Sequence, residues 1–356
     1  MVLDSSTIED ETKFVLRNED SKGTSGKIRY LCIDVFRGIA IVSMIFVNVI
    51  APFNRVPSWS KHAVDFGLTY VDLVAPFFMF AIGLTYKMSF ERYYKKQGKL
   101  QTYIRFVRRY AAFFGMGIIG SRYIFTLEGV KFSWGVLQAI GIAGIFTLFF
   151  MKFPRIIRFI LGFSLLAVYQ YILTIPIEIE GTIVILGDLS WYDEHGGVIG
   201  GIGFCIMMLL STTIIDDFRK TNKWQILGIG GVFTVLGTTL HFIWKVTDWP
   251  LYGGISKERV TAAYILLTVG LGAVLFWLLW YIYDVKHLTK DRSLLQPIGR
   301  NAFFIYITHP ILIGLTILIL SDNAHFALVM FFGILSVVLL WLLSFFMDRK
   351  KIYIVI

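Results

Sequence analysis

The sequence predicts an all-α, polytopic membrane protein with about ten transmembrane helices in one bundle. Of its 356 residues, 56% are hydrophobic and only 16% are charged, and a water-soluble domain could not bury that much apolar surface. The apolar residues also gather in runs of about 20, the length that crosses a bilayer as a helix. The runs are 31–51, 66–88, 104–127, 132–151, 156–175, 197–215, 225–245, 260–284, 297–320 and 326–347.

The loops between these runs predict the orientation of the chain. The formal net charge is +10, but the basic residues gather in short loops, which is a pattern of membrane topology rather than of nucleic-acid binding. With ten spans, all the basic loops fall on one side, which the positive-inside rule makes cytoplasmic, together with both termini. We therefore expect a multi-pass protein of the cell membrane, with a disordered cytoplasmic tail over residues 1–28 and one membrane domain over 29–356.

Cysteine and histidine usage gives no sign of a metal centre. Cys32 and Cys205 lie in apolar runs, so neither a disulfide framework nor a cysteine metal site is expected. His195 follows two acidic residues directly, but consecutive residues do not converge on one ion, and no metal site is predicted.

One set of polar residues lies at the inner ends of the predicted helices. Asp34 and Arg37 are three residues apart, so they share a helix face and can pair. The pair has two interpretations: an ion pair at the cytoplasmic lip of the membrane, or an anion site, since a guanidinium matches phosphate geometry. Arg300 and Asn301 lie near the cytoplasmic end of the ninth run and belong to the same set.

A second set lies deeper in the membrane or toward its outer side. It consists of Asn48, His62, Asp72, Gln138, Asp193, Lys257 and His309. Asn48 could make an interhelical hydrogen bond and His62 could be a solvated interface residue, whereas an ionisable group as deep as Asp72 is by default functional or paired. The two sets predict a polar path across the bundle. Such a path fits a proton-coupled secondary transporter, and it equally fits an enzyme whose donor enters from the cytoplasm and whose acceptor waits outside.

Six stretches of the sequence, taken together and in order, resemble a known family. They are RYLCIDVFRGIAIVSMIFVN, KHAVDFGLTYVDLVAPFFMFAIG, WGVLQ, YDEHGG, SKERVTAAYILL and GRNAFFIYITH. Over roughly residues 29–310 they resemble the heparan-α-glucosaminide N-acetyltransferase family of transmembrane acyltransferases. The resemblance implies transfer of an acetyl group from cytoplasmic acetyl-CoA to an amine or hydroxyl of a small extracytoplasmic acceptor, such as an amino sugar, and it implies a homodimer. Because the chain departs from the family pattern at Asp65, Ala139, Val260 and in the turn 193–196, the family's own acceptor is not carried over.

The resemblance also implies roles for single residues. His62 matches the family's active-site histidine and Asn48 its neighbouring asparagine, so we expect His62 to act as base or acyl carrier and Asn48 to hold the thioester carbonyl. Asp72 is expected to anchor the second span beneath His62 by hydrogen bonding within the bundle. The residues expected to bind acetyl-CoA are Asp34, Arg37, Arg300 and Asn301, and those expected to line the acceptor side are Gln138, Asp193, Lys257 and His309. The helix from Arg37 to Asn48 is about 16 Å long, close to the reach of a pantetheine arm. A transporter would be expected to show an inverted repeat, and none is visible in the sequence, so the enzyme is favoured.

Overall fold

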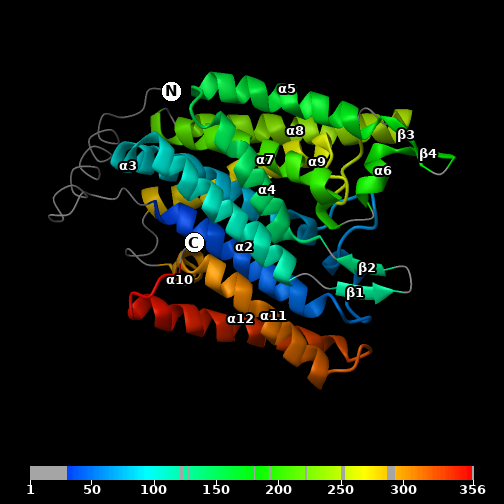
Figure 1. The fold of residues 1–356 in the computed structure, drawn as a ribbon. Helices are drawn as coiled ribbons and strands as arrows, with labels where there is room; N and C mark the ends of the chain where they lie inside the picture. Colours follow the sequence, from blue (N-terminus) through cyan, green and yellow to red (C-terminus); the bar gives the residue numbers. More distant parts are fainter. Residues whose placement is uncertain are drawn as a thin grey trace.

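The long helices run along one common direction and form a bundle (Figure 1). The structure is a computed structural model that describes residues 30–120, 123–126, 129–132, 134–179, 181–191, 194–220, 223–249, 253–286 and 293–354. The long helices are α2 (Leu31–Ile50), α3 (Val74–Gly120), α4 (Val136–Phe150), α5 (Arg155–Leu173), α7 (Gly197–Lys220), α8 (Trp224–Thr247), α9 (Ala262–Leu279), α11 (Ala302–Ile319) and α12 (Phe326–Arg349). The predicted tail over residues 1–28 lies outside the described residues.

Shorter elements connect or extend these helices. Two antiparallel hairpins are formed by β1 (Tyr123–Thr126) with β2 (Gly129–Phe132) and by β3 (Pro176–Ile179) with β4 (Thr182–Ile185). The short helical elements are η1 (Ser58–Ser60), η2 (Tyr70–Leu73), α6 (Leu186–Trp191), η3 (Glu194–Gly196), η4 (Trp280–Val285) and α10 (Gln296–Arg300).

The predicted class, an all-α polytopic membrane protein, is confirmed. In the described part of the chain, eight helices are long and apolar enough to cross a membrane. They contain nine of the ten predicted runs, because the 51-residue helical segment Tyr70–Gly120 holds two of them, joined at Gly98, whose φ of 79° leaves the helical region. The remaining run corresponds to α4, whose 15 residues reach about 22 Å, less than the ~30 Å hydrocarbon core.

The predicted limits of the third and fourth runs are wrong. The third was expected to continue to residue 127 and the fourth to begin at residue 132, but α3 ends at Gly120 and α4 begins at Val136. Between them, residues 123–126 and 129–132 form the β1–β2 hairpin, in which the backbone of Tyr123 pairs with that of Phe132. Tyr, Ile, Phe and Val favour strands as readily as they raise hydropathy, so an apolar run alone does not separate the two structures.

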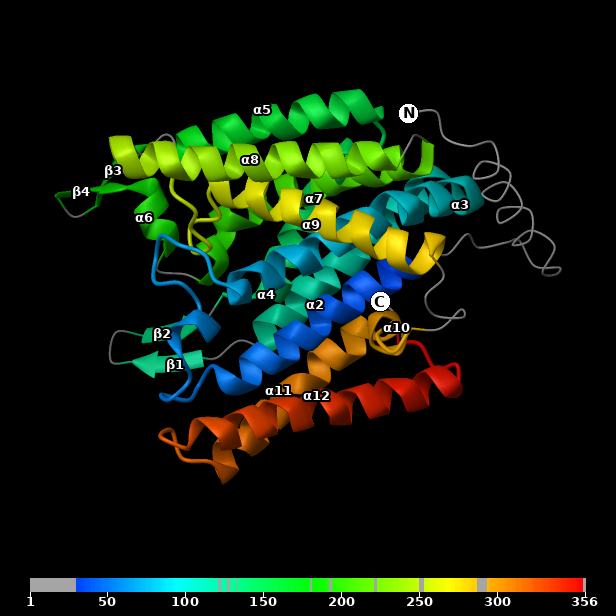
Figure 2. The same cartoon turned by 180° about the vertical axis from the view of Figure 1, so that it is seen from behind.

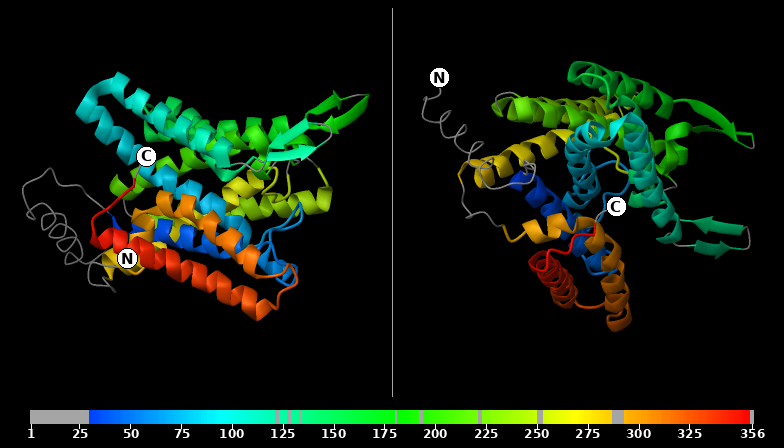
Figure 3. Two further views of the ribbon diagram at one scale, coloured as in Figure 1. Left: turned by 60° about the horizontal axis from the view of Figure 1, so that its bottom comes forward. Right: turned by 60° about the vertical axis from the view of Figure 1, so that its left-hand side comes forward.

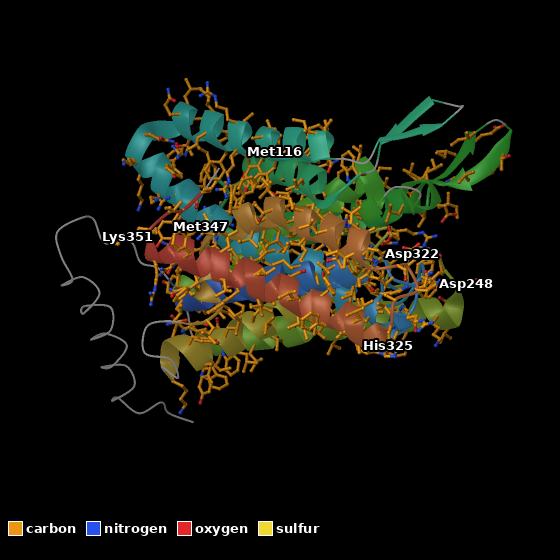
Figure 4. All side chains as sticks on the ribbon, turned by 90° about the horizontal axis from the view of Figure 1, so that it is seen from below. Met116, Asp248, Asp322, His325, Met347 and Lys351 are labelled. Carbon is orange, nitrogen blue, oxygen red and sulfur yellow. The ribbon has the colours of Figure 1, made fainter. Side chains whose placement is uncertain are left out.

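The two hairpins lie at one end of the bundle, which we call the hairpin end (Figures 1 and 2). Met347 and Lys351 lie at the opposite end from Asp248, Asp322 and His325 (Figure 4). We call the end with Lys351 the basic end. The basic segment 349–351 therefore lies at the opposite end of the bundle from the loops at Asp248 and at Asp322 (Figure 4).

Helix α2 lies between two layers of the bundle. It contacts α3 and α9 on one side and α10, α11 and α12 on the other, and Figure 3 shows α11 and α12 as an outer layer beside it. A Cβ on Gly38 would overlap the carbonyl oxygen of Leu295, and one on Gly299 would overlap that of Asp34. Two backbones approach this closely only where side chains are absent, which is how small residues pack helices in membranes.

The packing of α8 on α9 also depends on small residues. A Cβ on Gly237 would lie 2.6 Å from the Leu267 nitrogen and 2.7 Å from the Ala263 oxygen, whereas a Cβ on Gly228 in the same helix would meet nothing within 4 Å. Gly237→Ala should therefore destabilise the protein by about 1–3 kcal/mol through overpacking. Gly228→Ala should leave the stability unchanged or slightly higher. Thermal unfolding of the detergent-solubilised variants measures both effects, and equal midpoints for the two variants would contradict the packing.

Candidate functional site

A large cavity opens at the basic end. Its volume is about 1110 Å³. The basic residues that line it are Arg37, Arg92, Lys95, Arg105, Arg108, Arg109, Arg219 and Arg300, and the acidic residues are Asp34 and Glu91. Eight cations against two carboxylates make the cavity strongly positive. Guanidinium groups in such numbers favour an anionic ligand with several phosphate oxygens.

Asp34 ties two of these arginines together at the cavity wall. Its carboxylate accepts a hydrogen bond from Arg37 Nη2 at 2.5 Å, and its second oxygen lies 3.7 Å from Arg300 Nε. Arg300 also donates to Asp348 at 3.0 Å. The structure therefore brings together three residues that the sequence placed in one set. The Nε atoms of Arg37, Arg109 and Arg300 are buried without a hydrogen-bond partner among the described residues.

Other contacts hold the opposite wall. Arg219 donates to Glu91 at 2.7 Å, and Lys87 lies 3.5 Å from the other oxygen of the same carboxylate. The guanidinium groups of Arg92 and Arg105 lie 4.9 and 4.1 Å from the centre of the Tyr93 ring. These pairs fix the directions in which the cations point.

Asn301 lies at the junction of α10 and α11, both of which contact α2. Its side chain is fully buried. Neither its amide nitrogen nor its amide oxygen has a partner in the described part of the structure. A buried amide without partners costs free energy, but Asn301 is not among the residues that line the cavity, so its predicted role in binding a ligand stays a prediction.

His62 and Asp72 form a hydrogen-bonded pair at 2.7 Å between Nδ1 and Oδ1. Asp72 is buried and belongs to η2, and the His62 side chain is 44% exposed. The second Asp72 oxygen accepts from the backbone nitrogens of Ala63 at 3.2 Å and Thr69 at 2.8 Å, and from the Thr69 hydroxyl at 3.1 Å. An ionised carboxylate can only accept a hydrogen bond, so Nδ1 is the donor and carries the proton. In the neutral ring the free lone pair is then on Nε2, which can act as a base.

Two further contacts hold this pair, and sequence reasoning missed both. The buried Tyr264 hydroxyl of α9 donates to the Asp72 carbonyl oxygen at 2.6 Å. Arg259 pairs with Asp65 and also donates to Asp188 at 3.1 Å. Asp65 is one of the positions at which the chain departs from the family pattern, and this ion pair gives it a local role in anchoring the loop that carries His62.

Asn48 and His309 form a second pair, at 3.2 Å between Nδ2 and Nε2. The other ring nitrogen of His309 donates to the Tyr306 carbonyl oxygen, so Nε2 is the acceptor and Asn48 is the donor. Val47 and Val49, which flank Asn48, share an apolar cluster with Val71 of η2. The structure thus brings together two residues to which the sequence assigned different roles, on the face of α2 that packs against α11.

The other predicted acceptor residues make local contacts. The Gln138 amide oxygen accepts from the Gly135 nitrogen at 3.1 Å, which caps the start of α4. Lys257 is buried and lies 2.8 Å from a Glu258 carboxylate oxygen. Asp193 lies outside the described residues. An acceptor role for these three stays a prediction.

His195 is a buried histidine that the sequence did not place in the site. Its φ of 58° is left-handed, and its Nδ1 is buried with no hydrogen-bond partner in the described part of the chain. Burial lowers the pKa of His195 well below its usual value, and the positive charges of Lys257 and of a protonated His62 act in the same direction. His195 therefore stays neutral near the His62–Asp72 pair.

These features define the chain as a multi-pass helical membrane protein with a cationic cavity at one end and a histidine–carboxylate pair in the region of the other. A family model described as heparan-alpha-glucosaminide N-acetyltransferase, catalytic, matches residues 29–193. The heparan-alpha-glucosaminide N-acetyltransferase of Mus musculus is 22% identical over 368 residues, which cover 83% of this chain and 55% of the relative. The predicted resemblance to this family is confirmed by both comparisons, and the chain spans about half the length of the curated relative that it matches.

The buried His195 makes stability depend on pH. Its folded-state pKa is lowered, so the unfolded chain binds the proton more readily, and stability should fall as pH drops below the unfolded value near 6.5. His195→Asn keeps a residue that tolerates left-handed φ and should lose less stability between about pH 7.5 and about pH 5 than the wild type. His325→Asn, at an exposed helix start, is the control. Unfolding midpoints at both pH values measure the effect, and an equal loss in all three proteins would contradict the assignment.

Proposed function

We propose that this protein is a transmembrane acetyltransferase. It takes the acetyl group of acetyl-CoA bound in the cationic cavity and transfers it to an amine or hydroxyl of a small acceptor, such as an amino sugar, at His62. The observation that carries the proposal is that α2 joins the two sites: Asp34 and Arg37 line the cavity, and Asn48 lies on the same helix toward the hairpin end.

The residues at the basic end fit the donor. The cavity offers arginine donors in excess of its carboxylates, which suits the phosphate groups of coenzyme A. The orphan amide of Asn301 matches the peptide-like amides of a pantetheine arm, which carry both a donor and an acceptor. From Arg37 to Asn48, α2 rises about 16 Å, comparable to the length of that arm. These matches support Arg37, Arg300 and Asn301 as donor-binding residues, with Asp34 positioning both arginines.

His62 supplies the chemistry that acyl transfer needs. The lone pair of Nε2 takes the proton of the attacking amine or hydroxyl as the acceptor bonds to the acetyl carbon, the carbon–sulfur bond breaks, and the thiolate leaves with the proton. Asp72 holds the ring through Nδ1 and stabilises the imidazolium. In the alternative route, Nε2 itself carries the acetyl group before the acceptor attacks. Asn48 donates one amide hydrogen to His309 and has a second that could stabilise the oxyanion.

The distribution of Lys and Arg is the basis on which we assign the two ends of the bundle to the two sides of the membrane. The basic end carries the loops rich in Lys and Arg, so we place it, with both termini, in the cytoplasm, where acetyl-CoA is supplied. The acceptor side then faces away from the cytoplasm across the cell membrane. The family resemblance is also the basis for proposing a homodimer.

Replacing His62 tests the reaction. His62→Ala should lower acetyl-CoA turnover with glucosamine by about 10²–10⁴-fold, the usual contribution of a general base, while leaving acetyl-CoA affinity near the wild-type value. His325→Ala is the histidine control. Thioester loss by the purified protein is the measurement. Turnover that survives in His62→Ala would overturn the role of His62. If acetyl-CoA neither bound nor turned over, the proton-coupled transporter would be the better account.

Replacing Arg37 tests the donor site. Arg37→Gln removes one charged donor from the cavity wall and should weaken acetyl-CoA binding about 10- to 100-fold. Arg55→Gln, which changes an exposed arginine in the loop after α2, should bind acetyl-CoA like the wild type. Calorimetric titration measures both affinities, and an unchanged affinity in Arg37→Gln would show that the cavity does not hold the donor.

A further inference from the structure

A second, smaller cavity lies at the basic end, between α10 and the end of α12. Its volume is about 440 Å³. It shares Arg300 and Tyr353 with the donor cavity but is otherwise lined by different residues. Figure 4 shows Lys351, one of the lining residues, at this end of α12.

The charges of this cavity favour an anion. Arg300, Arg349 and Lys351 line it together with Asp348. Asp348 is already engaged, because it accepts from Arg300 and from the Tyr353 hydroxyl, each at 3.0 Å. Arg349 and Lys351 have no carboxylate partner among the described residues. Two cations are therefore left to bind a ligand.

The same cavity has an apolar, aromatic wall. Trp341 and Phe345 stack with ring centres 5.4 Å apart. The Trp341 indole nitrogen donates to the Leu294 carbonyl oxygen at 2.7 Å, which fixes the orientation of its ring. The Arg349 guanidinium lies 4.8 Å from the centre of the Phe345 ring. A ligand at this site would contact both the cations, which can bind a phosphate, and the apolar, aromatic wall.

Helix α12, which supplies the aromatic wall, also has an exposed apolar surface. Only 22% of the apolar window of α12 is buried within the protein, and the last turns of the helix expose Val338, Leu342 and Phe346. Tryptophan is enriched where such helices leave the bilayer. Basic pockets between helices at this level are suited to the headgroups of acidic lipids.

We propose that this cavity binds the headgroup phosphate of an anionic phospholipid from the adjacent leaflet, with Arg349 and Lys351 as the phosphate-binding cations. The acyl chains extend along the exposed apolar face of α12. A free phosphate or a soluble phosphate ester would use the two cations but would gain nothing from that face. The proposal does not rest on the acetyl transfer proposed above, because its phosphate-binding cations, Arg349 and Lys351, do not line the donor cavity.

The test uses delipidated, detergent-purified protein. We expect short-chain phosphatidylglycerol to bind at lower concentration than either short-chain phosphatidylcholine or glycerol 3-phosphate, as measured by native mass spectrometry. The double variant Arg349→Gln/Lys351→Gln should bind phosphatidylglycerol about 30-fold more weakly, since each basic residue near a lipid surface is worth roughly fivefold in affinity. Lys245→Gln is the control, because Lys245 is an exposed lysine in the last turn of α8, three residues before Asp248 at the opposite end of the bundle (Figure 4).

Each alternative result decides against the proposal. Equal binding of phosphatidylcholine would show a site without charge selection, and equal binding of glycerol 3-phosphate would show a site for soluble phosphates. Unchanged binding by the double variant, or an equal loss in Lys245→Gln, would show that the cavity is not where the lipid binds. Thermal unfolding of each variant checks that it is folded.

Discussion

The close approach of α2 and α10 is the contact on which the rest of the site depends. Gly38 and Gly299 lie so near the opposing carbonyl oxygens of Leu295 and Asp34 that neither position has room for a Cβ. This contact brings Arg300 within reach of Asp34. It also places Asn301 beside α2, the helix that runs from the cationic cavity toward Asn48. A larger residue at Gly38 or Gly299 would push α2 and α10 apart. This would separate the proposed acetyl-CoA-binding residues of the two helices before it moved any atom that takes part in the reaction.

Whether a buried polar group has a partner in the structure indicates whether its role is structural or in ligand binding. Buried charge is expensive in a membrane protein unless it is paired, and α5 and α7 follow this rule: Arg158 pairs with Asp216 and Thr212, and Arg155 lies 2.5 Å from Asp217. Arg37 and Arg300 are paired as well, although the Nε atom of each, like that of Arg155, has no hydrogen-bond partner among the described residues. The amide of Asn301 differs, because neither its nitrogen nor its oxygen has a partner in the described part of the chain. Arg37 and Arg300 line the cavity in which the phosphorylated donor is proposed to bind, so a ligand there is the natural source of partners for their Nε atoms. Asn301 follows Arg300 directly but is not among the residues that line the cavity.

The sequence was most informative where local composition decides the outcome. Each predicted run has a helix in the structure, and the inner and outer polar residues separate along α2, because apolar length and charge act locally. The β1–β2 hairpin was missed because short apolar strands look like helix ends. The contacts of Asn48 with His309, of Tyr264 with Asp72, and of Arg259 with Asp65 join segments far apart in the chain. They depend on tertiary packing, which no local pattern of one sequence reveals.

The central claim is that donor and acceptor meet from opposite sides of the membrane, and a sided assay tests it most directly. The protein would be reconstituted into sealed vesicles loaded with glucosamine, and acetyl-CoA, which does not cross the bilayer, would be added outside only. The account predicts acetylated glucosamine inside the vesicles, formed by the wild type and not by His62→Ala. Product that forms only when donor and acceptor share one side would contradict it.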